Sequence, residues 1–130
     1  MAAGNPAEIV GAFSTIAKER ADAVCIFPSA MLFAEYGAIA NIAAERRLPA
    51  IYAAREGVEL GGLISYGANL PNLSRQTALY VDKVLKGVNP AELPVQQPTK
   101  FELVINLKTA KALDLKITRD FLLIADEVIE

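Results

Sequence analysis

Polar and aromatic side chains follow three short apolar runs of the sequence, each at a point where a strand is predicted to end. The three runs cover residues 23–27, 50–53 and 63–66. In an open parallel sheet, ligands bind beyond the carboxyl ends of the strands. The residues placed there, which we expect to contact a small ligand, are Pro28, Ser29, Arg55, Glu56 and Tyr66.

These side chains suit the binding of a small organic molecule. Ser29 offers a hydroxyl, and the helix behind it offers free backbone N–H groups to a carboxylate. Arg55 can hold a carboxylate through two parallel hydrogen bonds, and Tyr66 can stack on a flat ligand. Each has a structural alternative: Ser29 as a helix N-cap, Arg55 as a loop charge paired with Glu56, and Tyr66 as a lid on the core.

The composition argues against catalysis and against nucleic-acid binding. The chain has no histidine, which removes the most common general base and metal ligand. Gly61 and Gly62 lack the spacing of a phosphate loop, and Ser65 has no histidine to activate it. The formal net charge is −2, so no basic surface attracts nucleic acid. We expect no enzyme activity, no metal, no other cofactor and no nucleic-acid partner.

Helical and strand patterns alternate along the chain. Helices are predicted at residues 6–20, 30–47, 72–86, 106–113 and 120–124, and strands at residues 23–27, 50–53, 63–66 and 101–105. Residues 55–57 form a polar loop, and residues 125–130 give no clear pattern. This order predicts an α/β protein with a parallel sheet flanked by helices in three α/β/α layers. A chain of 130 residues can bury one core, so residues 1–130 are expected to form a single domain.

Several residues have specific roles in these predicted elements. Asn5 is expected to cap the first helix, and Cys25 is expected to be a buried, inert thiol. Phe33 and Tyr36 lie on the apolar stripe of the second helix and are expected in the core. Gly87 suits the left-handed position that ends the third helix. The buried side of that third helix is expected to be Leu73, Thr77, Tyr80, Val81, Val84 and Leu85.

Four stretches resemble one protein family. They are RLPAIY at residues 47–52, GGLISYG at residues 61–67, YVDKVLKG at residues 80–87, and LPVQQPTKFELVINLKTAKAL at residues 93–113. The family is the ABC-transporter solute-binding family, whose known ligands include aromatic amino acids. The resemblance extends over residues 13–130, and the last of the four stretches is the most specific.

The resemblance implies a type I periplasmic binding fold, in which two α/β lobes hold a ligand in the cleft between them. Members are more than twice this length, and the chain matches the second lobe with the segments that cross the hinge. It would bind a small organic solute, such as an amino acid, for delivery to an ABC permease. The full-length parent would be periplasmic or lipid-anchored outside the cytoplasm, although this chain shows no signal-peptide pattern.

The same resemblance implies that the third helix packs on the first lobe. Without that lobe its apolar face would be exposed, and a homodimer could cover it. A second function remains open, because the same lobe can serve as the ligand-binding domain of a sensory or regulatory protein. A nucleotide-using enzyme is disfavoured, since no strand is followed by a glycine-rich phosphate loop.

Overall fold

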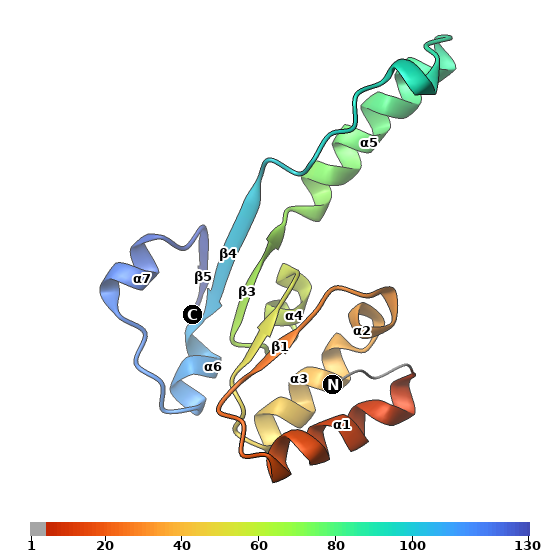
Figure 1. Cartoon of the computed structure of the whole chain (residues 1–130). Helices are drawn as coiled ribbons and strands as arrows, with labels where there is room; N and C mark the ends of the chain where they lie inside the picture. Colours follow the sequence, from red (N-terminus) through yellow and green to blue (C-terminus); the bar gives the residue numbers. More distant parts are fainter. Residues whose placement is uncertain (1–4) are drawn as a thin grey trace. The chain divides into compact units, whose positions relative to one another are not determined.

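A computed structural model describes residues 5–130 of the chain (Figure 1). It divides into two compact units. The larger comprises the chain up to Gly67 together with Glu102–Glu130, and the smaller comprises Ala68–Phe101. The expectation of one domain over the whole chain stays a prediction.

The larger unit is built on a five-stranded sheet with the strand order β1-β2-β3-β4-β5. The strands are β1 (Val24–Ile26), β2 (Ala50–Tyr52), β3 (Ile64–Ala68), β4 (Phe101–Asn106) and β5 (Glu127–Ile129). Strand β2 pairs in parallel with both β1 and β3, and β4 pairs in parallel with β5. Hydrogen bonds from Asn106 N to Leu63 O and from Asn69 N to Lys100 O mark the β3–β4 pair as antiparallel. The predicted α/β class is confirmed, and the sheet, which was predicted to be parallel, is mostly parallel.

Helices flank this sheet and close the core. They are α1 (Pro6–Lys18), α2 (Ala30–Ala34), α3 (Tyr36–Glu45), α4 (Arg55–Glu59), α6 (Leu107–Ala112) and α7 (Arg119–Leu123). Phe13 of α1, Ile39 of α3 and Val58 of α4 are each at most 3 % exposed. Their burial removes apolar surface from water, which is the main force that holds the unit together.

The predicted helix over residues 30–47 forms as two helices. Glu35 stands between α2 and α3 with φ −99° and ψ 9°, so the chain bends there while staying close to helical geometry. Because the backbone leaves the helical region so little, the apolar spacing continues across the break. That continuity is why the sequence pattern does not reveal it.

Three further predictions differ from the structure. The stretch expected to be a polar loop contains α4, which spans five residues and is too short to show a helical period. The unassigned tail contains β5. Cys25 is exposed rather than buried, because it lies on an edge strand and its side chain points to the sheet face opposite the buried Ile26.

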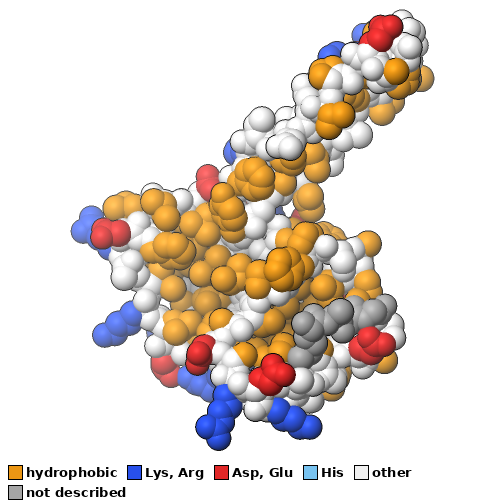
Figure 2. All heavy atoms as spheres, viewed as in Figure 1, with side chains coloured by type: hydrophobic (Ala, Val, Ile, Leu, Met, Phe, Trp, Pro, Cys, Tyr) orange, Lys and Arg blue, Asp and Glu red, His pale blue; other side chains and the backbone are white. Residues whose placement is uncertain are grey.

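Burial on that opposite face falls from β4 to β1. Ile105 of β4 is 0 % exposed, Ile64 of β3 is half-buried, Ile51 of β2 is 38 % exposed, and Cys25 of β1 is exposed. Hydrophobic side chains gather over the region of the strands in the view of Figure 2. The part of this face formed by β1 and β2 therefore presents apolar surface to solvent.

The smaller unit contains α5 (Leu70–Leu85) and the short 3-10 helix η1 (Pro90–Glu92). Asn69 caps α5, because its side chain accepts a hydrogen bond from Asn72 N. Gly87 has φ 94°, as predicted for the position that ends the helix. No residue of α5 is buried. On the side expected to be buried, Leu73 and Tyr80 are half-buried, and Thr77, Val81, Val84 and Leu85 are exposed. Within residues 5–130, no helix is long and apolar enough to span a membrane.

Gly67 lies where β3 passes closest to the loop after β2. A Cβ atom placed on this residue would collide with the carbonyl oxygen of Ala53. The collision is with backbone, so a larger side chain cannot be accommodated by a rotamer change. Glycine at this position therefore keeps the ends of β2 and β3 side by side.

We predict that Gly67→Ala lowers the free energy of unfolding by about 1–3 kcal/mol through overpacking. Gly11→Ala is the matched control, because Gly11 is exposed in α1 and a Cβ there meets nothing within 4 Å. The control should raise stability by about 0.5–1 kcal/mol. Urea denaturation of both variants measures the difference, and equal effects would contradict the steric account.

Candidate functional site

The carboxyl ends of β1, β2 and β3 lie at one edge of the sheet, because the three strands are parallel neighbours. The register pairs Ile26 with Tyr52 and Tyr52 with Ser65. The loops after β1 and β2 therefore begin beside Tyr66, which the sequence placed at a strand end but which lies within β3, because that strand continues to Ala68. All five residues that the sequence predicts to contact a ligand lie in or shortly after these three strands, and their contact with a ligand stays a prediction.

Pro28 and Ser29 follow β1, and both are exposed. The hydroxyl oxygen of Ser29 accepts a hydrogen bond of 3.0 Å from Leu32 N and caps α2. The structural alternative for Ser29 is thus present in the chain. An exposed capping hydroxyl still has a donor hydrogen and a further lone pair, so the cap does not prevent contact with a ligand.

Arg55 begins α4, and its guanidinium faces carboxylates. Its Nε atom donates to Glu59 at 2.9 Å, and its Nη2 atom donates to Glu127 at 2.9 Å. Glu102 lies at 4.0 Å from Nη1. The hydrogen bond to Glu59 is the main cause that raises the pKa of Arg55. Arg55 therefore ties α4 to β4 and β5, a role different from the expected pairing with Glu56.

The charge at this part of the edge is negative. One guanidinium stands against Glu59, Glu102 and Glu127, and two of its three nitrogen atoms already donate hydrogen bonds. A ligand carboxylate would have to compete with these three carboxylates for Arg55. The arrangement favours a structural role for Arg55 over the carboxylate clamp.

Glu56 and Tyr52 have buried polar atoms close to the carboxyl end of β2. Among residues 5–130, the buried side-chain atoms without a hydrogen-bond partner are the Tyr52 hydroxyl and Oε2 of Glu56. The Tyr52 ring fills a slot beside Gly57 and Gly62, since a Cβ on either glycine would collide with it. Tyr36 packs edge-to-face on Tyr52 with ring centroids 5.1 Å apart. These contacts set the position of α4 and hence of the edge.

Two exposed aromatic rings border the same edge. Tyr66 is 62 % exposed and Phe27, directly after β1, is 72 % exposed. Phe27 is not among the five predicted residues, because it ends an apolar run that predicts a strand. Its alternation with the buried Ile26 was the signal that could have revealed it. Of the two aromatics predicted to lie in the core, Tyr36 is 1 % exposed, as expected, whereas Phe33 is 41 % exposed.

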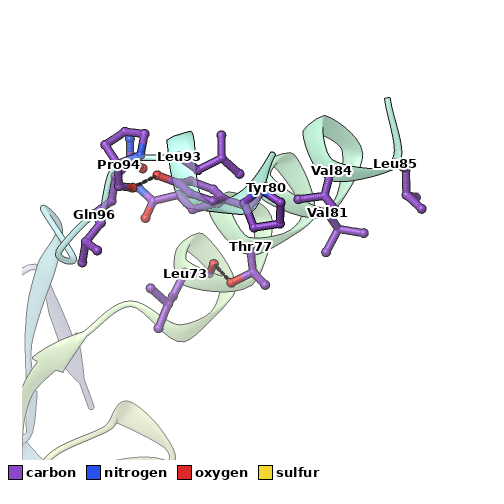
Figure 3. A pocket seen from close by; sticks show the side chains of 12 residues that line it. Leu73, Thr77, Tyr80, Val81, Val84, Leu85, Leu93, Pro94 and Gln96 are labelled. Atoms are coloured by element: carbon purple, nitrogen blue, oxygen red, sulfur yellow. Dashed lines mark hydrogen bonds between the residues drawn. The ribbon is translucent and has the colours of Figure 1, made fainter. Parts of the chain in front are cut away.

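A concave feature lies within the smaller unit. It is a groove of about 540 Å³ between α5 and the segment that follows η1 (Figure 3). The Tyr80 hydroxyl donates a 2.6 Å hydrogen bond to the carbonyl oxygen of Pro94 and so joins the two sides of the groove. Its lining is mostly apolar and includes Leu73, Val81 and Val84. It contains none of the five predicted residues.

Comparison with known proteins identifies the family of the chain. The sequence profile described as ABC transporter substrate binding protein matches residues 1–129. The chain belongs to this family. No curated protein shows a significant match.

Solved structures of similar fold support this assignment. A conserved domain protein from Vibrio cholerae is 28% identical, with a TM-score of 0.89 over 97% of this chain. An ABC domain from Streptococcus pneumonia, solved in complex with L-Trp, is 27% identical with a TM-score of 0.89 over 99% of this chain. A ligand-free, open substrate binding protein from Clostridium difficile, CD0873, is 21% identical with a TM-score of 0.63 over 95% of this chain and shares the fold.

The chain spans less than half of each relative. It covers 42% of the Vibrio protein, 43% of the Streptococcus protein and 41% of the Clostridium protein. This agrees with the expectation that the sequence matches one portion of a longer binding protein.

The unpartnered Tyr52 hydroxyl gives a prediction for alkaline pH. Burial is the main cause that raises the pKa of Tyr52 to about 12 from 10.0. The unfolded chain loses this proton first, so the contribution to stability is complete below pH 10.0 and is lost as the pH rises toward 12. At pH 11, one unit above the ordinary pKa of 10.0, Tyr52→Phe should remove about 1.4 kcal/mol of this alkaline loss.

At neutral pH, Tyr52→Phe should be neutral or stabilising, because it removes a buried hydroxyl that makes no hydrogen bond. Tyr36→Phe is the control, because the Tyr36 hydroxyl forms a hydrogen bond with the backbone of Ala53. The control should cost about 1 kcal/mol. Urea denaturation at pH 7 and pH 11 measures both variants. A large loss for Tyr52→Phe at pH 7 would mean that its hydroxyl has a partner.

Proposed function

We propose that the chain forms part of the solute-binding component of an ABC transporter. In this role it binds a small organic solute, such as an amino acid, which the whole protein delivers to a membrane permease. The observation that carries the proposal is the meeting of three parallel strand ends with their loops at one edge of the sheet, in a chain of the substrate-binding family. No catalytic step is involved.

The proposed solute site consists of Pro28, Ser29, Arg55, Glu56 and Tyr66. Ser29 offers its exposed hydroxyl and Tyr66 offers its exposed ring to the solute. Glu56 supplies a carboxylate beside the edge, and Pro28 fixes the backbone that leads into α2. Arg55 acts mainly by holding α4 in place through Glu59 and Glu127.

The whole protein is proposed to act outside the cytoplasm, as a periplasmic or lipid-anchored protein. The support for this location is membership of the ABC transporter substrate binding protein family. Delivery requires a second partner, the permease, which would recognise the loaded protein. The L-Trp complex of the Streptococcus relative makes aromatic amino acids the first solutes to test.

A panel of amino acids and small carboxylates tests solute binding. Binding to the folded state raises thermal stability, and a solute at 100 times its Kd adds about 2.7 kcal/mol. Affinity depends on burying most of a ligand. Because this chain spans less than half of its relatives, we expect weak binding, and the solutes should be tested at millimolar concentration. We expect a rise in Tm with one class of solute.

Tyr66→Ala should abolish that rise, whereas Leu79→Ala should preserve it. Leu79 is the matched control because it is 62 % exposed, like Tyr66, but lies on α5 in the other unit. Binding that survives Tyr66→Ala would contradict the proposed site. The absence of a Tm rise across the panel would contradict solute binding by the chain.

We also propose that the apolar side of α5 is covered by a second copy of the chain. Leu85 is 81 % exposed, Val81 is 51 % exposed and Val95 is 98 % exposed, and charged residues are absent from the groove they border. Exposed apolar patches of this kind tend to be interfaces. A two-fold pair of chains would bury the same face on both copies.

Size-exclusion chromatography with light scattering tests the homodimer. The chain should elute with twice its mass of 13.9 kDa, and Val81→Glu should shift it to monomer, because a charge would be buried in an apolar interface. Ser74→Glu, at an exposed position of α5 outside the groove lining, should leave the dimer intact. A monomer at all concentrations would contradict the proposal.

A further inference from the structure

A cavity of about 320 Å³ lies at the amino ends of β2 and β3. Ala50, the first residue of β2, and Leu63, which directly precedes β3, both line it. Its side walls are formed by α3 and α6. Every lining residue belongs to the larger unit, and none belongs to the proposed solute site. The cavity is therefore separate from the carboxyl ends of the strands.

The floor of the cavity is bare backbone for steric reasons. Gly62 is buried, and a Cβ atom there would collide with the Tyr52 ring and with the carbonyl oxygen of Gly57. Gly61 has φ 105°, a backbone conformation that glycine adopts far more readily than other residues. Several of the side chains that α3 and α6 add are alanines: Ala40, Ala43, Ala44 and Ala112. The fold itself therefore keeps this space open.

A salt bridge joins the two walls of the cavity. Arg47 follows the carboxyl end of α3, and Asp114 follows that of α6. Nη2 of Arg47 lies 2.6 Å from Oδ2 of Asp114, and both residues have left-handed backbones, with φ 52° and 58°. The two side chains are 60% and 85% exposed, and ion pairs as exposed as this add little to stability. An incoming carboxylate can therefore replace Asp114 at small cost.

The charge on the cavity lining is positive. Arg47 and Lys108 line the cavity, and none of its lining residues carries a carboxylate. Within residues 5–130, Lys108 takes part in no ion pair. The remaining lining is mainly apolar and includes Leu48, Leu63 and Leu113. An anion with an apolar body matches both properties.

We propose that this cavity binds a small aliphatic monocarboxylate. Its carboxylate would accept hydrogen bonds from Arg47 and Lys108, and its hydrocarbon chain would lie against the three leucines. Because a water molecule occupies about 30 Å³ of liquid volume, the cavity has room for roughly ten non-hydrogen atoms. A carboxylic acid of about six carbons fits this limit. The site is additional to the proposed solute site and does not depend on it.

A phosphate group fits the same lining less well. Phosphate sites often use free backbone N–H groups at turns. Here the Gly61 N–H donates to the carbonyl oxygen of Val58 at 3.0 Å, and the Gly62 N–H donates to that of Gly57 at 2.8 Å. Neither glycine is free to donate to an anion, which leaves the two side-chain cations to bind it.

Two ligands with the same hydrocarbon chain test the site. The full chain is titrated with sodium hexanoate and with hexan-1-ol, and NMR records the backbone amide signals. Hexanoate should shift signals at residues 43–48, 61–63 and 108–113. Hexan-1-ol lacks the charge, so it should bind there about 10-fold more weakly.

Four variants locate the binding residues. Ala44→Leu should prevent hexanoate binding, because the larger side chain fills the cavity; Ala38→Leu is the matched control, at an exposed position of α3 outside the lining. Lys108→Gln should weaken hexanoate binding about 2- to 5-fold and leave hexan-1-ol unaffected. Lys111→Gln, on α6 outside the lining, should change neither affinity. Circular dichroism checks that each variant is folded.

The other outcomes separate this site from the proposed function. Hexanoate shifts confined to residues 27–29, 53–56 and 66–67 would overturn the cavity site and leave solute binding at the strand ends standing. Equal affinities for hexanoate and hexan-1-ol would overturn recognition of the carboxylate. No shift at the cavity with millimolar hexanoate would also overturn the site, whatever the amino-acid panel shows.

Discussion

The parallel pairing of β1, β2 and β3 is the constraint on which the site depends. Parallel neighbours end at the same edge of a sheet. Residues that are far apart in the sequence are therefore brought to the same edge. On the buried face of the sheet, the Tyr52 ring packs against Gly57 and Gly62 and positions α4, which stabilises this pairing. It is reinforced at the edge itself by the close approach of Gly67 to Ala53. Glycines therefore permit the contacts that align the three strand ends.

Apolar surface is distributed unevenly over the chain. One face of the sheet is covered by α1, α3 and α4, whereas the opposite face is increasingly exposed from Ile105 toward Cys25. Helix α5 has no buried residue, although an amphipathic helix gains most of its stability from packing its apolar side. Both observations fit a chain that represents less than half the length of its solved relatives. The site at the strand ends is unaffected, because its residues come from the larger unit alone.

Much of this architecture follows from local patterns in the sequence. The N-cap at Asn5, the left-handed Gly87 and the order of strands and helices were predictable, since each depends on nearby residues. Helix α4 and strand β5 were not, because five and three residues carry no period. The exposure of Cys25 depends on which strand lies at the sheet edge, and the partners of Arg55 come from β4 and β5. Both are long-range properties. The exposure of Phe27 could not be predicted, because an apolar run conceals which of its members face solvent.

Mapping of backbone amide chemical shifts over the whole chain with L-tryptophan tests solute binding at the strand ends most directly. The strand ends belong to the larger unit and the groove belongs to the smaller unit, so the position of the shifted signals distinguishes them. We expect the largest changes at residues 27–29, 53–56 and 66–67. Changes concentrated in the groove at residues 73–96, with the strand ends unaffected, would contradict a solute site at the edge of the sheet.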